Sequence, residues 1–447
     1  MPKVSSLPVN PFDSSYCSAV GALPGDDVAG MDGLRQMARV ICSSQGLPSP
    51  KQEAWKYSSL RNLSRTPFIP ASRADDVDVG QVPYTVPFLE DALKLVLVNG
   101  EFRPDLSGSL DRLGDGVIVQ PIARSLSTTP KKLHGIIGAI ADPESSFIAA
   151  LNTGFMEDGL FILVRPGKEI KRPLHIVSIG ASGASPGSFH PRFVVELGKG
   201  SGAVIVESHI GLPGQSYLTN VLTEVTVGEG AQLNHYVHVC EDVEAFHLGQ
   251  SVVSVKDDGS YESFIFSEGA RLCRREVKVC LQAENAGAYV NGAYVLTAKQ
   301  HSDIFSEIVH AAPNTTSNQM IKGVLGGESF GAFQGKIHVA RNAQKSDGQQ
   351  SHKALLLSSG PEVNCKPELE IFADDVKCSH GASTGEIDKN QLFYLASRGI
   401  PETEARALLV QGFVNEVIFK IANEQVRNYI LDLAKSWLAR QSSVNNG

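Results

Sequence analysis

The chain has 447 residues, a formal net charge of −8 at pH 7, 42% hydrophobic residues and 20% charged residues. These proportions are ordinary for a globular protein that buries a large core, and the acidic balance argues against a nucleic-acid partner. No apolar run approaches the length that spans a bilayer, and Met1–Pro8 lacks the apolar segment of a secretory signal. We therefore expect a cytoplasmic protein without a membrane partner.

The seven cysteines cannot all be paired within one chain. Without an export signal, reduced thiols are favoured over a disulfide framework. No two cysteines have the C-x-x-C spacing that is typical of zinc and iron–sulfur sites, so we expect no stably bound cofactor. The cysteines are Cys17, Cys42, Cys240, Cys273, Cys280, Cys365 and Cys378.

Residues 1–95 are predicted to form a mainly helical region. Four apolar residues recur at the spacing of one helical face. Trp55 is interpreted as an aromatic anchor that packs against the rest of the protein, and Arg65–Pro87, rich in Pro, Asp and Val, is predicted to be a loop or linker. The residues of the helical face are Leu34, Met37, Ala38 and Ile41.

Residues 96–385 are predicted to be mainly β, because short β-branched runs alternate there with glycine. A turn-like glycine recurs at intervals of 28, 29 and 28 residues. A fixed interval between strand–turn units is typical of a solenoid, and a parallel β-helix is the economical choice, with glycine relieving the backbone at each corner. A β-propeller is the alternative, although the repeat is short for a blade. The glycines are Gly202, Gly230, Gly259 and Gly287, after which the pattern fades.

Polar residues within this region give weak signals of function. His238 and Cys240 fall on one strand face and His235 on the other, which would suit a metal pair. Outward side chains on a solvated strand are the favoured interpretation, because no further ligand lies near in sequence. Cys273 and Cys280 are interpreted as small buried hydrophobes.

The glycine-rich segments do not form a phosphate-binding loop. Neither Gly198–Gly202 nor Gly326–Gly331 has the Gly-x4-Gly-Lys-Ser/Thr pattern. We therefore expect a chain that does not hydrolyse ATP and is not itself an enzyme.

Residues 386–447 are predicted to be helical. Gly399 suits the end of one helix, and Pro401 suits the first turn of the next. Leu409, Phe413 and Val417 recur at a spacing of four and form part of a broad apolar stripe. Two interpretations stay open: the helices cap the solenoid, or the stripe binds a partner.

Cys378 and His380 are the main candidate functional pair. Residues i and i+2 of an extended segment share a face, so the thiol and the imidazole are predicted to project together. Both are ligands for iron, copper or zinc, yet two ligands are too few for a closed metal site. The pair is half of a transient site shared with another chain, or else a buried cysteine beside a surface histidine. Asp374 and Asp375 are weaker candidates for supporting ligands or for orienting the loop.

The segment Asp374–Gly385, with Asp388 and Leu392–Ile400 after it, resembles the SufB/SufD family of iron–sulfur cluster assembly scaffolds. Gly381 stands where SufB chains typically have Glu, so the resemblance is closest to SufD. It implies a right-handed parallel β-helix that pairs with a SufB-like subunit. It also implies that the C-terminal helical region binds a SufC-like ATPase, and that a nascent iron–sulfur cluster passes transiently near Cys378 and His380.

Two other functions are weighed against this one. A polysaccharide-active enzyme on a β-helix is disfavoured, because such enzymes are commonly secreted and carry clustered Asp and Arg residues. The SufB paralogue is disfavoured by Gly381 and by the lack of a recognisable sulfur-accepting cysteine. A homodimer of the lone chain is a further alternative to the heterocomplex.

Overall fold

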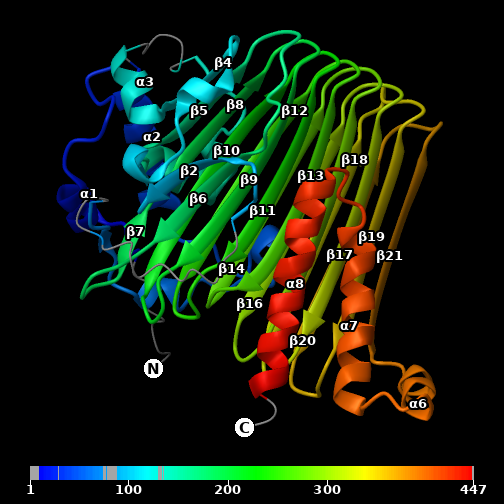
Figure 1. The fold of residues 1–447 in the computed structure, drawn as a ribbon. Helices are drawn as coiled ribbons and strands as arrows, with labels where there is room; N and C mark the ends of the chain where they lie inside the picture. Colours follow the sequence, from blue (N-terminus) through cyan, green and yellow to red (C-terminus); the bar gives the residue numbers. More distant parts are fainter. Residues whose placement is uncertain are drawn as a thin grey trace, which may run out of the picture.

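The computed structural model describes residues 10–28, 30–73, 77, 88–128, 133 and 135–444. Two long sheets face each other, and helices lie at the N-terminal end and across one outer face (Figure 1). Within the described ranges, no helix combines the length and the apolar character that a bilayer crossing requires.

The first sheet has eleven strands. Nine run in the order β4 (Val117–Pro121), β5 (Gly159–Val164), β8 (Arg192–Leu197), β10 (Tyr217–Val227), β12 (Phe246–Val255), β14 (Leu272–Leu281), β16 (His301–His310), β18 (Phe330–Val339) and β20 (Glu362–Ile371). β7 (Gly187–Phe189) also pairs with β10, and β1 (Ile69–Pro70) pairs with β7.

The second sheet has ten strands. They run in the order β3 (Glu101–Phe102), β2 (Leu93–Val98), β6 (Leu174–Gly180), β9 (Gly202–Gly211), β11 (Gln232–Cys240), β13 (Ser260–Gly269), β15 (Gly287–Leu296), β17 (Thr316–Leu325), β19 (Asp347–Leu356) and β21 (Lys377–Glu386).

From β8 onward, consecutive strands alternate between the two sheets, and each pairs in parallel with the strand two places further along the chain. The chain therefore winds as a parallel β-solenoid with two strands per turn, which confirms the predicted fold class and excludes the propeller. Successive partners in the second sheet lie 27 to 31 residues apart and continue well past Gly287. They are Gly202, Gln232, Ser260, Gly287, Thr316, Asp347 and Lys377.

In every turn from β5–β6 to β18–β19, the corner that leads from the first sheet to the second contains a residue with left-handed backbone. Its amide donates to a carbonyl of the next turn, as from Gly230 to Asp257 at 2.8 Å and from Asp258 to Glu284 at 3.0 Å. The prediction that glycine occupies each corner is wrong in detail, because Asp and Asn tolerate the left-handed region and take over after Gly230. The corner residues are Gly167, Gly200, Gly230, Asp258, Asn285, Asn314 and Lys345, with φ between 53° and 67°.

The core lies between the sheets, where alternate residues of each strand point inward. Ile205, Leu233 and Ile265 come from the second sheet, and Val225 and Val253 come from the first. All five are at most 2% exposed. This inner column of β-branched and leucine side chains accounts for the Val-rich runs of the sequence.

The N-terminal helices pack on the first sheet. Met31, Ala38 and Cys42 are buried on α2, so the predicted helix is confirmed, although Met37 is exposed. Trp55 is buried with its ring centroid 4.1 Å from the guanidinium carbon of Arg274, as expected of an anchor. Helical segments here are α1 (Ser14–Val20), α2 (Met31–Gln45), η1 (Glu53–Trp55), η2 (Leu63–Arg65), η5 (Pro104–Leu106), η6 (Leu110–Leu113), α3 (Ile122–Thr128), η7 (Pro143–Ser145) and α5 (Phe147–Phe155).

Part of the predicted linker Arg65–Pro87 is structured, because β1 falls within it. Residues 74–76 and 78–87 of that segment lie outside the described residues. The two sheets begin their regular stacking near Leu93 and end at Glu386, next to the limits of the predicted β region at 96 and 385.

Three helices follow the last strand: α6 (Lys389–Ser397), α7 (Glu402–Ile418) and α8 (Glu424–Val444). Figure 1 shows α7 and α8 lying along the outer face of the second sheet. Val414 and Ile418 of α7 pack in one apolar cluster with Val295 and Val324 of the sheet. The predicted apolar stripe is therefore largely a cover for the solenoid.

Candidate functional site

The C-terminal end of the solenoid is open. Each of β20 and β21 is the last strand of its sheet and has ten residues. Almost all of β21 is exposed, and much of β20 is only half-buried. Strands of this length present a row of unpaired backbone groups to a further strand.

Cys378 lies on β21 opposite Gly348 of β19. It is half-buried and packs against the small apolar cluster that contains Ile337 and Val339 of β18. Burial raises the pKa of the Cys378 thiol above its ordinary value; a hydrogen bond with the Gly348 backbone lowers it, and the Asp347 carboxylate raises it. The thiol is therefore protonated at neutral pH, and the isolated chain does not activate it.

His380 is exposed two residues further along β21, opposite Gln350. The extended strand puts Cys378 and His380 on one face, as the spacing predicts. Asp374 and Asp375 lie in the corner before β21, where the Asp375 amide donates to Gln344 Oε1 at 2.9 Å. Among the described residues, no third ligand atom completes a metal set with Cys378 and His380, and a site shared with another chain stays a prediction.

A groove of about 270 Å³ lies between the end of β21 and α7. Leu409 and Phe413 line it, and the Phe413 ring centroid lies 4.2 Å from Lys322 Nζ. Pro401 is exposed at the start of α7. Val417 is fully buried against the solenoid, so it has no surface for a partner; partner binding by the other three stays a prediction.

Aromatic side chains are exposed beside this groove and the open end. Phe393 and Tyr394 of α6 are 75% and 58% exposed, and Phe372 after β20 is 58% exposed. No residue of α6 is buried. An exposed apolar group of this kind is typical of a protein–protein contact.

The sequence interpretation was wrong about His238. His238 is fully buried, and its Nε2 lies 2.9 Å from Glu268 Oε1, beneath α8, whose Tyr429 ring contacts it. Cys240 is half-buried beside it. The outer strand face is not solvated here, because α8 covers it, and that contact is invisible in the local pattern.

A second buried group was missed altogether. His209, Glu241 and His247 each offer a ligand atom, and these atoms lie within 4.8 Å of one another. Burial raises the pKa of Glu241 to about 7, against the effect of His209, and lowers the pKa of His247 well below its ordinary value. The three residues lie near strand ends on different turns, and only the stacking of turns brings them together.

Comparison with known proteins decides the family. The profile described as "SUF system FeS cluster assembly, SufBD core domain" matches residues 179–413, and the profile of the SufBD protein N-terminal region matches residues 12–176. The chain belongs to the SufBD family. These proteins take part in iron–sulfur cluster assembly, which the resemblance around Cys378 predicted.

Three relatives show how far the SufBD similarity extends. An iron–sulfur cluster assembly SufBD family protein of Synechocystis is 29% identical over 396 residues, covering 87% of this chain and 86% of the relative. The iron–sulfur cluster assembly protein SufD of Escherichia coli is 28% identical over 400 residues, covering 89% and 90%. Protein ABCI7, chloroplastic, of Arabidopsis thaliana is 29% identical over 458 residues, covering 98% and 91%.

Proposed function

We propose that this SufBD family chain is a SufD-like, non-catalytic scaffold in the cytoplasm. Its open end joins a SufB-like subunit, and its C-terminal helices hold a SufC-like ATPase. The observation that carries the proposal is the pair of exposed parallel edge strands, β20 and β21, with Cys378 and His380 on one face of β21.

Strand addition is the contact that this end suits best. A partner with matching edges would extend both sheets, and main-chain hydrogen bonds would supply affinity while the inward side chains supply specificity. It would also cover apolar side chains near the last turn that are now half-buried, among them Val363, Leu369 and Cys378. A second copy of the chain would use the same edges, so a homodimer competes with the heterocomplex.

Cys378 and His380 would bind the cluster, which is cargo, at the joint, meaning the contact between β20 and β21 of this chain and the SufB-like partner. Thiolate sulfur and imidazole nitrogen suit iron, and the partner would supply the remaining ligands. The raised pKa of the Cys378 thiol keeps it protonated in the lone chain, so loading awaits a cation or a basic group brought by the partner. The chain itself would bind no cofactor stably.

The proposed binding surface for the ATPase consists of the groove lined by Leu409 and Phe413 and the exposed aromatic side chains of α6. Deleting the chain after Gly399 would not test this cleanly, because α7 and α8 cover apolar residues of the second sheet. Point changes at exposed or half-buried positions test it without uncovering the solenoid.

Co-purification with the SufB-like and SufC-like proteins of the same organism tests the scaffold role. We expect a stable complex that contains one copy of this chain, one SufB-like chain and two SufC-like chains, read from its mass. Elution of this chain alone under gentle conditions contradicts the proposal.

Within the complex, Cys378→Ala and His380→Ala should each lower the yield of assembled cluster at least about 10-fold, by analogy with the loss of a metal-site residue. Folding and complex mass should not change, because β21 is exposed in the lone chain. Cys280→Ala is the matched control, since Cys280 is also partly exposed but lies on β14. Normal cluster yield from both variants refutes their role.

Phe393→Ser and Leu409→Ser should weaken binding of the ATPase subunit, each by about 10-fold or more, because buried aromatic and aliphatic anchors dominate such contacts. Tyr289→Ser is the control: Tyr289 is also exposed, at 39%, but lies on β15. If both variants bind the ATPase at parental affinity, its binding surface lies elsewhere.

A further inference from the structure

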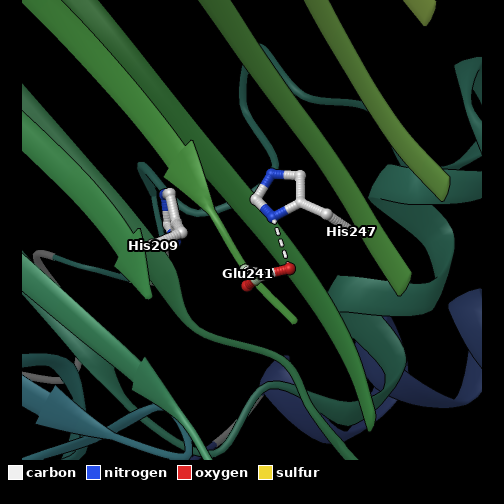
Figure 2. Close-up of side chains that lie close together, drawn as sticks. All are labelled: His209, Glu241 and His247. Carbon is white, nitrogen blue, oxygen red and sulfur yellow. Dashed lines mark ion pairs between the residues drawn. The ribbon is translucent and has the colours of Figure 1, made fainter. Parts of the chain in front are cut away.

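His209, Glu241 and His247 meet inside the solenoid, in a region separate from the open end. His209 lies near the end of β9, Glu241 directly follows β11, and His247 is the second residue of β12. Figure 2 shows the three side chains turned toward a common space, with His247 paired to Glu241. The His209 and His247 ring centroids are 4.9 Å apart.

Four polar atoms of this group have no hydrogen-bond partner although they are buried. They are His209 Nδ1, both ring nitrogens of His247, and Glu241 Oε2. His247 Nδ1 lies 3.3 Å from Glu241 Oε2, but the geometry is not that of a hydrogen bond. The histidines are fully buried, and Glu241 is 7% exposed. Buried polar groups without partners are costly and rare, so their convergence on one point calls for a ligand.

The neighbours hold two of these groups in the form that binds a cation. Glu207 Oε2 lies 3.1 Å from His209 Nε2, so the Nε2–H donates to it and the Nδ1 lone pair stays free. Thr219 donates to Glu241 Oε1 at 2.7 Å, which leaves Oε2 toward the histidines. A carboxylate behind a metal-binding histidine is the usual outer support of such sites.

The local charges also permit a cation. Arg275 contributes one positive charge beside the histidines and donates to Ser251. Glu207 and Glu241 contribute two carboxylates, and Glu207 is further held by His235 Nε2 at 2.7 Å from Oε1. The guanidinium therefore reduces the attraction for a cation without cancelling it.

The other buried group, His238, Cys240 and Glu268, is more fully paired. Glu268 Oε1 faces His238 Nε2, and Glu268 Oε2 pairs with Arg440. Both carboxylate oxygens are thus engaged within the chain, and the group closes the contact between the second sheet and α8. It does not compete as an ion site.

From these contacts we propose that His209, Glu241 and His247 form an internal binding site for a divalent first-row transition-metal ion. Two imidazoles and one carboxylate are the donor set of His₂Glu zinc centres and of non-haem Fe(II) centres. The ligand atoms now lie within 4.8 Å of one another. Side-chain adjustments would bring each of them to the distance of about 2.0–2.2 Å that one ion requires. The remaining coordination positions are left for water.

The proposed route for the ion runs through the loop between β11 and β12, in which Val243 is 55% exposed. Glu241, the first residue of the loop, is itself a ligand, so opening of these few residues exposes the site from one edge of the solenoid. The proposal concerns the lone chain and stands apart from its assembly with partners.

Titration of the chelator-treated full-length chain with Co²⁺ and Zn²⁺ tests the site. We expect one Co²⁺ per chain, with visible ligand-field bands and no thiolate-to-cobalt charge-transfer band. Glu241→Gln and His247→Asn should each weaken binding at least about 10-fold. Zn²⁺ should also raise the Tm of the parent but not that of Glu241→Gln, because an ion that binds only the folded state stabilises it.

His310→Asn is the matched control, since His310 is a buried solenoid histidine whose two nitrogens are held by Thr315 and Ser317, each at 2.8 Å. It should bind Co²⁺ as the parent does. Equal affinity in the parent and Glu241→Gln overturns the site. A thiolate band that disappears in Cys240→Ala or Cys378→Ala also overturns it, because the ion would then lie elsewhere. Should His247→Asn not fold, the near-isosteric Glu241→Gln decides the question.

Discussion

The two ends of the solenoid are finished in opposite ways. At the N-terminal end, the two-residue β3 and the short β4 pair antiparallel with β2 and β5, so neither sheet offers a long parallel edge there. Helices α2 and α5 pack together beside this end, and α5 contacts β10 and β12. At the C-terminal end, β20 and β21 keep ten residues each and nothing in the described chain follows them in either sheet.

The difference indicates where a partner is needed. A free edge is a hazard for aggregation, and proteins cover it or make it short. At its N-terminal end this chain has short edge strands with helices beside them, whereas its C-terminal edge strands are long and uncovered. Helices α6 to α8 follow the last strand, but they pack on the outer face or project beyond it (Figure 1). The open edge is therefore the surface that we propose for assembly, whereas the closed end offers no long edge to a partner.

The largest effect is expected at the closed end. Arg192 is fully buried, its Nε lies 2.9 Å from Glu224 Oε1, and its Nη1 donates to Asn152 and Thr153. Arg192→Met leaves Glu224 buried without its counter-ion, which should lower the free energy of unfolding by about 3–5 kcal/mol. Urea unfolding of the lone chain measures this.

Arg271→Met is the control for that variant, because the Arg271–Glu244 pair at 3.0 Å is largely exposed. A surface pair of this kind contributes about 1 kcal/mol or less. Similar losses in the two variants would mean that the closed end is no more stabilising than the surface.

The next effect is expected at the open end. Ala382 lies on β21 on the same face as Cys378 and His380, and it is exposed in the lone chain. Ala382→Lys would bury an unpaired ammonium in the joint, so affinity for the SufB-like partner should fall at least about 100-fold, or about 2.7 kcal/mol. Calorimetric titration measures the affinity.

The Tm of the lone Ala382→Lys chain should not change, so a loss of affinity can be assigned to the contact with the partner and not to unfolding. Ser44→Lys, at an exposed position of α2 in the N-terminal region, should leave partner affinity as it is. Parental affinity in Ala382→Lys contradicts pairing through β21.

Local patterns predicted the parts of this molecule that local physics decides. The Val-rich runs gave the strands, and the i, i+2 spacing placed Cys378 and His380 on one face of β21. The length of one turn was also predicted, from the glycine intervals, because each turn must return the chain to the same register. Contacts between distant turns could not be read in this way: the burial of His238 depends on α8, and His209, Glu241 and His247 meet only after the turns stack.

Local patterns also failed to predict which residues occupy the left-handed corners, and substitutions at these corners are expected to have the smallest effect on stability. The predicted glycine repeat coincides with a left-handed corner only at Gly230, and the later corners are Asp258, Asn285, Asn314 and Lys345. Lys345 is the corner nearest the open end, and its amide donates to the Asp375 carbonyl ahead of β21. A lysine at φ 61° is strained, so Lys345→Gly should stabilise the chain by about 0.5–1 kcal/mol.

Gly200→Ala makes the reverse change at a corner nearer the closed end, where φ is 60° and nothing lies within 4 Å of an added Cβ. Since only the backbone opposes it, this variant should lose about 1 kcal/mol. Thermal unfolding compares both with the parent. Opposite signs would show that the same backbone rule holds at both corners. A loss in Lys345→Gly would instead mean that the lysine side chain itself supports the turn that leads into β21.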